Sequence, residues 1–310
     1  MEYTVKREDE GKTVKALVTE LLHPSAKLLR SIKYRPDGIL LCGQRVTVRA
    51  TVHEGDVLAL TLDDEGYDRS PEPIDLPISV LYEDEQLVVP SKSGNMPTHP
   101  SHDHHFDTVA NALAYRYRQS GTPFVFRPVN RLDRETSGLL LVARDRLACG
   151  RLNAAMQAGE IKKTYLAVLC DEALPEVGEI DLPLHRSAAS IIVREVCRSD
   201  APDAEPSLTR YRVLARSQGC CLVEASPITG RTHQLRVHFA ALGAPILGDS
   251  LYGSPDARIG RQALHAWSLS FPHPSSGERM TLIAPLPQDM ETLIRGLFPT
   301  WLDETEGSSV

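Results

Sequence analysis

A short apolar run near the middle of the chain, residues 139–143, sets the strongest constraint on the fold. The run reads Leu-Leu-Leu-Val-Ala, with Arg134 and Glu135 before it and Arg144 and Asp145 after it. Five apolar residues are too few to cross a membrane, and a short run bounded in this way is typical of a buried strand. We therefore expect a core strand here, with a polar loop in front of it.

One acid in that loop is a candidate for chemistry. Asp133 lies between Arg131 and Arg134, and residues 136–138 lead into the strand. A loop held by a rigid strand is a common place for a catalytic group. An aspartate is ionised at neutral pH unless its surroundings oppose it, and neighbouring guanidinium groups favour the charged form. On spacing alone, however, a solvated charge cluster in a turn explains the same residues and is the commoner arrangement.

Length and composition favour a globular protein without a membrane partner. A chain of 310 residues with 42% hydrophobic content can form one or two domains with a sizeable core. The first 12 residues are charged and lack the apolar segment of a signal peptide, so we expect a cytoplasmic location. The six cysteines have no C-x-x-C spacing, and the histidines of residues 99–105 are crowded into one polar loop. Neither pattern predicts a metal site or a disulfide framework.

The distribution of charge is more informative than the net charge of −7. Residues 12–49 contain eight Lys or Arg against two acids, and residues 116–163 contain ten against four. Between them, residues 63–85 contain nine acids and one arginine. The change in composition indicates a boundary. We expect an N-terminal domain over 1–70, a linker over 71–77, a main domain over 78–298 and a flexible tail over 299–310.

Three segments of the main domain resemble one known family. The stretch NRLDRETSGLLLVAR, residues 130–144, resembles the central motif of the RluA-type pseudouridine synthases, H-R-L-D-x-x-T-S-G-L-L-L, which carries the catalytic acid. Asn130 stands where that family usually has histidine. The stretch KKTYLAV, residues 162–168, is similar to the family's second active-site segment, and TGRTHQLRVHFAALGAPILGDSLYG, residues 229–253, is similar to its third motif. We expect residues 162–168 to form a strand and a helix to start at Arg231.

This resemblance implies isomerisation of uridine to pseudouridine in structured RNA, after the target base is flipped out. It makes Asp133 the catalytic acid, places Tyr165 against the base, and pairs Arg231 with Asp133. Taken alone, a tyrosine on a strand is as often a core residue. The residues that we expect to bind substrate are Arg131, which would hold the flipped nucleotide or fill its place, and Arg134, Thr136 and His233.

The implied fold is α+β, with a mixed, largely antiparallel sheet, flanking helices and a central cleft over about residues 78–290. Before it, two short helices and strands over 38–41, 46–52 and 57–62 resemble an S-four-like RNA-binding module. That resemblance rests on Ser25, the helical spacing and Gly55-Asp56. A small basic domain that binds nothing is the alternative.

Partners and rival functions follow from the same residues. The implied reaction needs no cofactor and no metal, and we expect a monomer acting on structured RNA, with ribosomal RNA favoured and transfer RNA open. A non-catalytic RNA-binding paralogue is the alternative, although Asp133, Tyr165 and Arg231 are all present. A hydrolase would normally need a second acid, and the motifs contain no obvious candidate.

Overall fold

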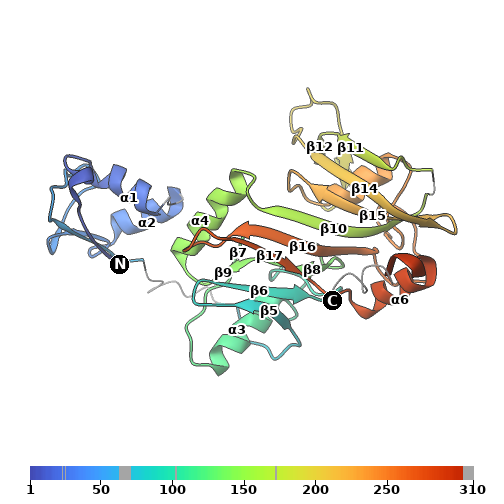
Figure 1. Cartoon of the computed structure of the whole chain (residues 1–310), viewed down its shortest axis with the longest axis horizontal. Helices are drawn as coiled ribbons and strands as arrows, with labels where there is room; N and C mark the ends of the chain where they lie inside the picture. The colour runs from blue at the N-terminus through green and yellow to red at the C-terminus, as the bar shows by residue number, and fades with distance from the viewer. Residues whose placement is uncertain (23, 25, 63–70, 102, 172, 303–310) are drawn as a thin grey trace.

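The computed structural model describes residues 1–22, 24, 26–62, 71–101, 103–171 and 173–302. A small four-stranded sheet with two helices forms the N-terminal unit, and an eleven-stranded sheet with flanking helices forms the rest (Figure 1). Most strand pairs are antiparallel. The expected α+β class with a mixed, largely antiparallel sheet is therefore confirmed.

The N-terminal unit buries the apolar stripe that its helical spacing predicts. Val14, Leu17, Val18 and Leu22 of the first helix are buried in one cluster with Leu58. Its sheet has the order β1-β4-β2-β3. The elements are β1 (Glu2–Thr4), the 3-10 helix η1 (Arg7–Asp9), α1 (Val14–Leu22), α2 (Ala26–Tyr34), β2 (Ile39–Leu41), β3 (Gln44–Arg45) and β4 (Val57–Leu60).

The strand expected over residues 46–52 is wrong. This segment is a loop whose carbonyl groups serve the start of α1. Val48 accepts a hydrogen bond from the N–H of Lys15 at 2.9 Å, and Ala50 accepts one from the N–H of Val14 at 2.8 Å. The first N–H groups of a helix have no partner within the helix, so a neighbouring loop can satisfy them in this way. Ser25 lies outside the described residues.

Residues 71–77, expected to be a linker, lie against the main unit. The side-chain amide of Asn111 donates to the carbonyl of Glu72 at 2.8 Å, and the N–H of Ile74 donates to the carbonyl of Asn111 at 3.3 Å. Leu76 packs against the main core. Residues 63–70, which contain four of the nine acids of residues 63–85, are outside the described residues.

The large sheet has the strand order β11-β14-β15-β10-β16-β8-β6-β9-β7, with β17 beside β16 and β5 beside β6. A separate hairpin pairs β12 with β13. The elements are β5 (Ser79–Glu83), β6 (Leu87–Lys92), α3 (Val109–Gln119), β7 (Arg127–Pro128), β8 (Ser137–Leu139), β9 (Val142–Ala143), α4 (Arg146–Gln157), β10 (Lys162–Leu169), β11 (Val177–Asp181), β12 (Leu184–Arg186), β13 (Arg194–Val196), β14 (Leu208–Ser217), β15 (Cys220–Pro227), α5 (Gln234–Ala241), β16 (Leu264–Pro272), β17 (Arg279–Ile283) and α6 (Gln288–Leu297).

The central apolar run contributes to both faces of this sheet. Leu139 and Leu141 are buried in a cluster with Leu152 of α4, whereas Leu140 and Val142 are buried in the cluster that includes residues of α3, α5 and α6. Because side chains alternate between faces along a strand, a run buried on both sides must be apolar throughout. The run is nevertheless two strands, β8 and β9, rather than one.

Asn130 supports the break between those strands. Its Oδ1 accepts the N–H of Leu141 at 2.7 Å, and its Nδ2 lies 3.4 Å from the carbonyl of Leu139. The side chain of Asn130 thus provides hydrogen-bond partners for the backbone groups of Leu139 and Leu141, where β8 ends and β9 has not yet begun. Asn130, which stands where the family usually has histidine, is therefore hydrogen-bonded to the segment that follows the Asp133 loop.

Gly138 lets β8 approach β16. These two strands form the one parallel pair among the described strands, with Gly138 opposite Ala266. The φ of Gly138 is +111°, and a Cβ at this position would collide with the carbonyl of Ala266. A side chain would therefore be excluded both by conformation and by contact.

The N-terminal unit lies beside α4 (Figure 1). Arg151 of α4 donates through Nη1 to the carbonyl of Pro274 at 2.8 Å and through Nη2 to that of Leu21 at 3.2 Å. Leu147 packs against the core of the N-terminal unit. A polar and an apolar contact therefore join the two units.

The chain end differs in part from the expected flexible tail. Leu302 is buried and Trp301 half-buried against the main core, because both carry large apolar side chains. Residues 303–310 lie outside the described residues. In the part of the chain that is described, no helix combines the length and apolar character needed to span a bilayer.

Candidate active site

A cavity of about 580 Å³ opens on the large sheet and collects side chains from distant parts of the sequence. The end of β7 and the loop between β7 and β8 contribute residues 128–133 and Thr136. Lys163 and Tyr165 come from β10, and residues 227–236 come from the end of β15 and the start of α5. Six of the seven site residues expected from the sequence thus line one cavity: Arg131, Asp133, Thr136, Tyr165, Arg231 and His233.

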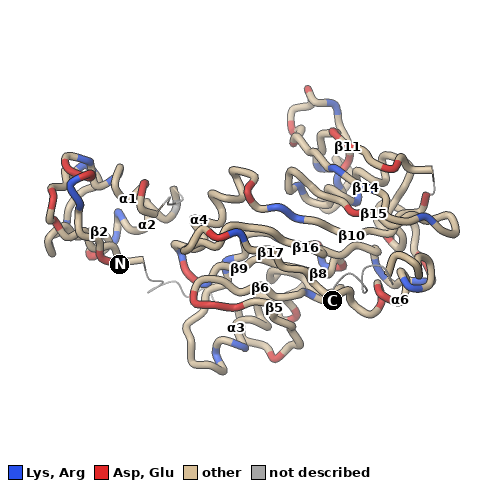
Figure 2. The backbone as a smooth tube through the Cα atoms, in the orientation of Figure 1, with Lys and Arg blue, Asp and Glu red and all other residues tan. Residues whose placement is uncertain are grey.

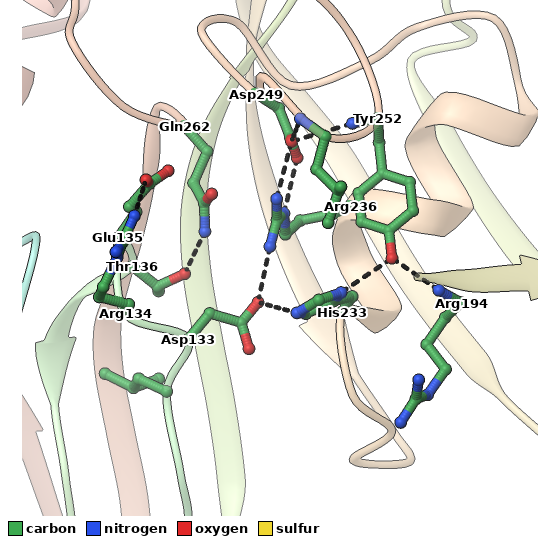
Figure 3. A network of polar contacts seen from close by, with 12 residues as sticks. Asp133, Arg134, Glu135, Thr136, Arg194, His233, Arg236, Asp249, Tyr252 and Gln262 are labelled. Atoms are coloured by element: carbon green, nitrogen blue, oxygen red, sulfur yellow. Dashed lines mark hydrogen bonds and ion pairs between the residues drawn. The ribbon is translucent and has the colours of Figure 1, made fainter. Parts of the chain in front are cut away.

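Two donors meet one oxygen of Asp133. Nη1 of Arg236 lies 3.3 Å from Oδ2, and Nε2 of His233 lies 3.8 Å from the same atom (Figure 3). Among the described residues no side chain hydrogen-bonds to Oδ1. The carboxylate is therefore held from one side, and its other oxygen remains available in the cavity.

Arg236 is itself held by a buried carboxylate. Nε and Nη2 bond the two oxygens of Asp249 at 2.7 and 2.8 Å, and Asp249 has no exposed surface. Burial alone would lower the pKa of Arg236, but hydrogen bonding and charge attraction to Asp249 and then Asp133 raise it. Burial likewise opposes ionisation of Asp249, but the bonds from Arg236 lower its pKa. Both groups are therefore charged, and the guanidinium has a fixed direction.

The predicted pairing of Arg231 with Asp133 is wrong. Arg231 lines the cavity, but its Nη1 lies 3.3 Å from Glu205 and its Nε donates to the carbonyl of Pro206 at 3.2 Å. Arg236 occupies the expected position because it lies on the first turn of α5. The helix begins at Gln234, three residues later than expected, because His233 adopts a left-handed conformation with φ of +58°.

The loop that carries Asp133 is fixed by buried polar contacts. Nζ of Lys92, which is 1% exposed, donates to the carbonyls of Ser93, Met96 and Arg134 at 2.8–2.9 Å. Burial lowers the pKa of Lys92 to about 7. The three carbonyls nevertheless need three N–H donors, which only the ammonium form supplies, so the hydrogen bonding favours the charged lysine. Its role in the site is to hold the loop.

The other predicted residues of this loop differ in their surroundings. Thr136 is buried beside the cavity and its Oγ1 accepts from Nε2 of Gln262 at 2.9 Å. Arg131 is exposed and lines the cavity. Arg134 is not part of the lining, and its guanidinium pairs with Glu135 at 3.0 Å. Arg131 therefore has access to a ligand in the cavity, whereas Arg134 points elsewhere.

Tyr165 forms a rigid wall of the cavity. It is 8% exposed and lies at a register shift between β10 and β16. Burial raises its pKa, and the charge of Asp133 raises it further. The phenol therefore stays neutral at physiological pH and presents an aromatic surface near the carboxylate.

Several residues of the site were not predicted from the sequence. Arg236 follows His233 by three residues at a helix start, a spacing that places both side chains on one face and could have identified it. Asp249 and Tyr252 lie in the third motif, but nothing in their spacing indicates contact with Arg236 or His233. Lys92 lies in a polar stretch of the sequence, from which its burial could not be predicted.

The fold thus forms a cavity in which a carboxylate with one open oxygen lies beside an aromatic wall. Residues 86–241 match the family model described as RNA pseudouridylate synthase. The chain belongs to this family and is an RNA pseudouridine synthase, an isomerase of uridine in RNA.

Relatives and solved structures agree with this assignment. The chain is 38% identical, over 92% of its length and 99% of the relative's, to the Bacillus subtilis (strain 168) protein named "Uncharacterized RNA pseudouridine synthase YjbO". It is 33% identical, over 93% of its length and 89% of the relative's, to "Ribosomal large subunit pseudouridine synthase D" of Xanthomonas campestris pv. campestris. The solved structure "Human RNA Pseudouridylate Synthase Domain Containing 1" superposes with a TM-score of 0.58 and 29% identity, covering 68% of this chain and 84% of that one.

Conservative substitution of each arginine distinguishes their roles. We expect Arg236→Lys to lower kcat by about 100-fold, because one ammonium group cannot bond both Asp249 and Asp133. Arg231→Lys should stay within about threefold of wild type, since its pair with Glu205 is solvent-exposed. The measurement is single-turnover pseudouridine formation, with circular dichroism to verify folding. Equal losses in the two variants would contradict the assignment of Arg236.

Proposed function

We propose that Asp133 is the catalytic acid of this enzyme and that its Oδ1 is the oxygen that acts on the target nucleotide. The observation that carries the proposal is that Arg236 bonds Oδ2 and His233 faces the same oxygen at 3.8 Å, which leaves Oδ1 open in the cavity. Charged and hydrogen-bonding groups that are already oriented before the substrate binds make a large contribution to the rate enhancement of many enzymes.

The reaction breaks the bond between N1 of uracil and the sugar, turns the base, and joins C5 to the same sugar carbon. The target must first leave the base stack, at a cost of a few kcal/mol. Exposed Arg131 at the cavity is suited to bind the phosphate of the flipped nucleotide or to fill its place. Tyr165 is suited to stack on the base, a contact worth about 1–3 kcal/mol.

We further propose a structured RNA substrate, with ribosomal RNA favoured over transfer RNA. Support comes from the relatives named as ribosomal large subunit pseudouridine synthases and from the two basic segments, one in the N-terminal unit and one that runs from α3 to β10 (Figure 2). The proposal includes a monomer acting in the cytoplasm without a cofactor.

Removal and restoration of the gene test this function. We expect pseudouridine mapping of total RNA to lose specific sites on removal, and to recover them with wild type but not with Asp133→Asn. Asparagine keeps the size of the side chain and removes the carboxylate, while RNA affinity should stay within about tenfold because phosphate contacts dominate binding. Recovery of the sites by Asp133→Asn would refute the role of Asp133.

A second test concerns the N-terminal unit, which we propose binds RNA as an S-four-like domain. Arg30 and Lys33 are exposed on α2. Replacing both by alanine should weaken binding of the full RNA and reduce the slope of log affinity against log salt by up to about two, one for each phosphate that is no longer neutralised. Turnover on a short RNA should be unchanged, as should turnover after deletion of residues 1–70. An unchanged affinity and salt slope would contradict RNA binding by this surface.

A further inference from the structure

His233 connects Asp133 to a tyrosine outside the cavity lining. Its Nε2 faces Oδ2 of Asp133 at 3.8 Å, and its Nδ1 lies 2.8 Å from the hydroxyl of Tyr252 (Figure 3). The two rings meet edge to face, with centroids 5.6 Å apart. The side chain of His233 is 12% exposed, so its imidazole has little access to solvent.

The hydroxyl of Tyr252 has two partners. The backbone N–H of Arg194, in the β12–β13 hairpin, donates to it at 2.9 Å, so this contact uses a lone pair of the tyrosine oxygen. The other partner is Nδ1 of His233. If Nδ1 carried a proton, the tyrosine oxygen would accept twice and its own proton would have no acceptor among the described contacts. Both groups are satisfied when Tyr252 donates to a bare Nδ1.

We propose that Tyr252 is a positioning residue. Its hydroxyl fixes the tautomer of His233 that carries the proton on Nε2, and this tautomer directs its Nε2–H at Asp133. The Nε2–H and the Nη1–H of Arg236 then converge on the same carboxylate oxygen. In a histidine, the hydrogen bond made by one ring nitrogen generally determines whether the other nitrogen carries the proton. The role of Tyr252 adds to the proposed role of Asp133, and the expected effect of Tyr252 on kcat rests on that proposed role.

Tyr252 is itself rigidly placed. Its backbone N–H donates to Oδ1 of Asp249 at 3.1 Å, and the guanidinium of Arg236 lies over its ring, 5.0 Å from the centroid. One tyrosine therefore contacts both groups that face Asp133. The distance of 3.8 Å from Nε2 is just beyond hydrogen-bond length, and such contacts often shorten when substrate binds.

The charges around His233 support a neutral ring. Burial lowers its pKa, the nearby charges of Arg236 and Arg194 also lower it, and those of Asp133 and Asp249 oppose them. Burial also raises the pKa of Tyr252, so its hydroxyl keeps its proton at neutral pH. A hydrogen bond donated to Nδ1 stabilises the neutral imidazole alone. Its removal must therefore raise the pKa of His233.

Nitrogen NMR of the full-length protein labelled with 15N-histidine tests the tautomer directly. We expect a protonated Nε2 and a bare Nδ1 for His233 in wild type, assigned by the loss of its signals in His233→Asn. Tyr252→Phe keeps the aromatic ring and removes the hydroxyl. It should give a mixture of tautomers and a higher titration midpoint. A proton on Nδ1 in wild type, or an unchanged tautomer and midpoint in Tyr252→Phe, would overturn the inference.

Kinetics supply the second readout. Tyr252→Phe should lower kcat by about tenfold with KM nearly unchanged, as expected for one misdirected hydrogen bond. The matched control is Tyr82→Phe, which removes a hydroxyl bonded to Asp84 at 2.8 Å, away from the cavity, and should leave kcat unchanged. Wild-type kcat in Tyr252→Phe, with Asp133→Asn inactive, would refute this inference alone. An active Asp133→Asn would instead refute the proposed function.

Discussion

The site depends on one guanidinium held between two carboxylates. Arg236 bonds Asp249 through Nε and Nη2 and reaches Asp133 with Nη1. Burial of unpaired charges is costly, so this group is stable only when its partners are in place. Asp249 also accepts the N–H groups of Leu251 and Tyr252 at 3.0 and 3.1 Å. Asp249 therefore accepts four hydrogen bonds, which fixes the arginine and directs Nη1 of Arg236 at Asp133.

The fold brings these groups together from two distant parts of the chain. Asp133 is in the loop before β8, Arg236 is on α5, and Asp249 follows that helix. The close parallel contact at Gly138 holds β8 against β16, and Arg261 donates to the carbonyl of Glu135 at 2.8 Å and to Ser137 Oγ at 3.2 Å. The stretch directly after Asp133 is consequently anchored by Lys92 and Arg261 before any substrate binds.

The sequence allows the class of fold and part of the site to be predicted. The apolar run of residues 139–143 indicated a buried strand because every position faces one core or the other. Asp133 and Tyr165 were identified by their motifs and do share the cavity. These features depend on local pattern, which a sequence displays directly.

The remaining features depend on geometry that local pattern does not contain. Arg231 and Arg236 lie in one motif, and only the left-handed turn at His233 decides which of them reaches Asp133. The break between β8 and β9 depends on a side-chain amide, Asn130, that replaces part of the strand ladder. The roles of Asp249 and Tyr252 arise from contacts between separate segments.

The turnover of Asp249→Asn tests most directly whether the buried Arg236–Asp249 pair positions Asp133. Asp249 is fully buried and outside the cavity lining, so it can influence the reaction only through the groups it holds. We predict a folded protein that binds RNA with wild-type affinity and has a kcat reduced by about 10- to 100-fold, because a neutral amide no longer fixes Arg236. Wild-type kcat in folded Asp249→Asn would contradict the claim that this buried pair positions Asp133.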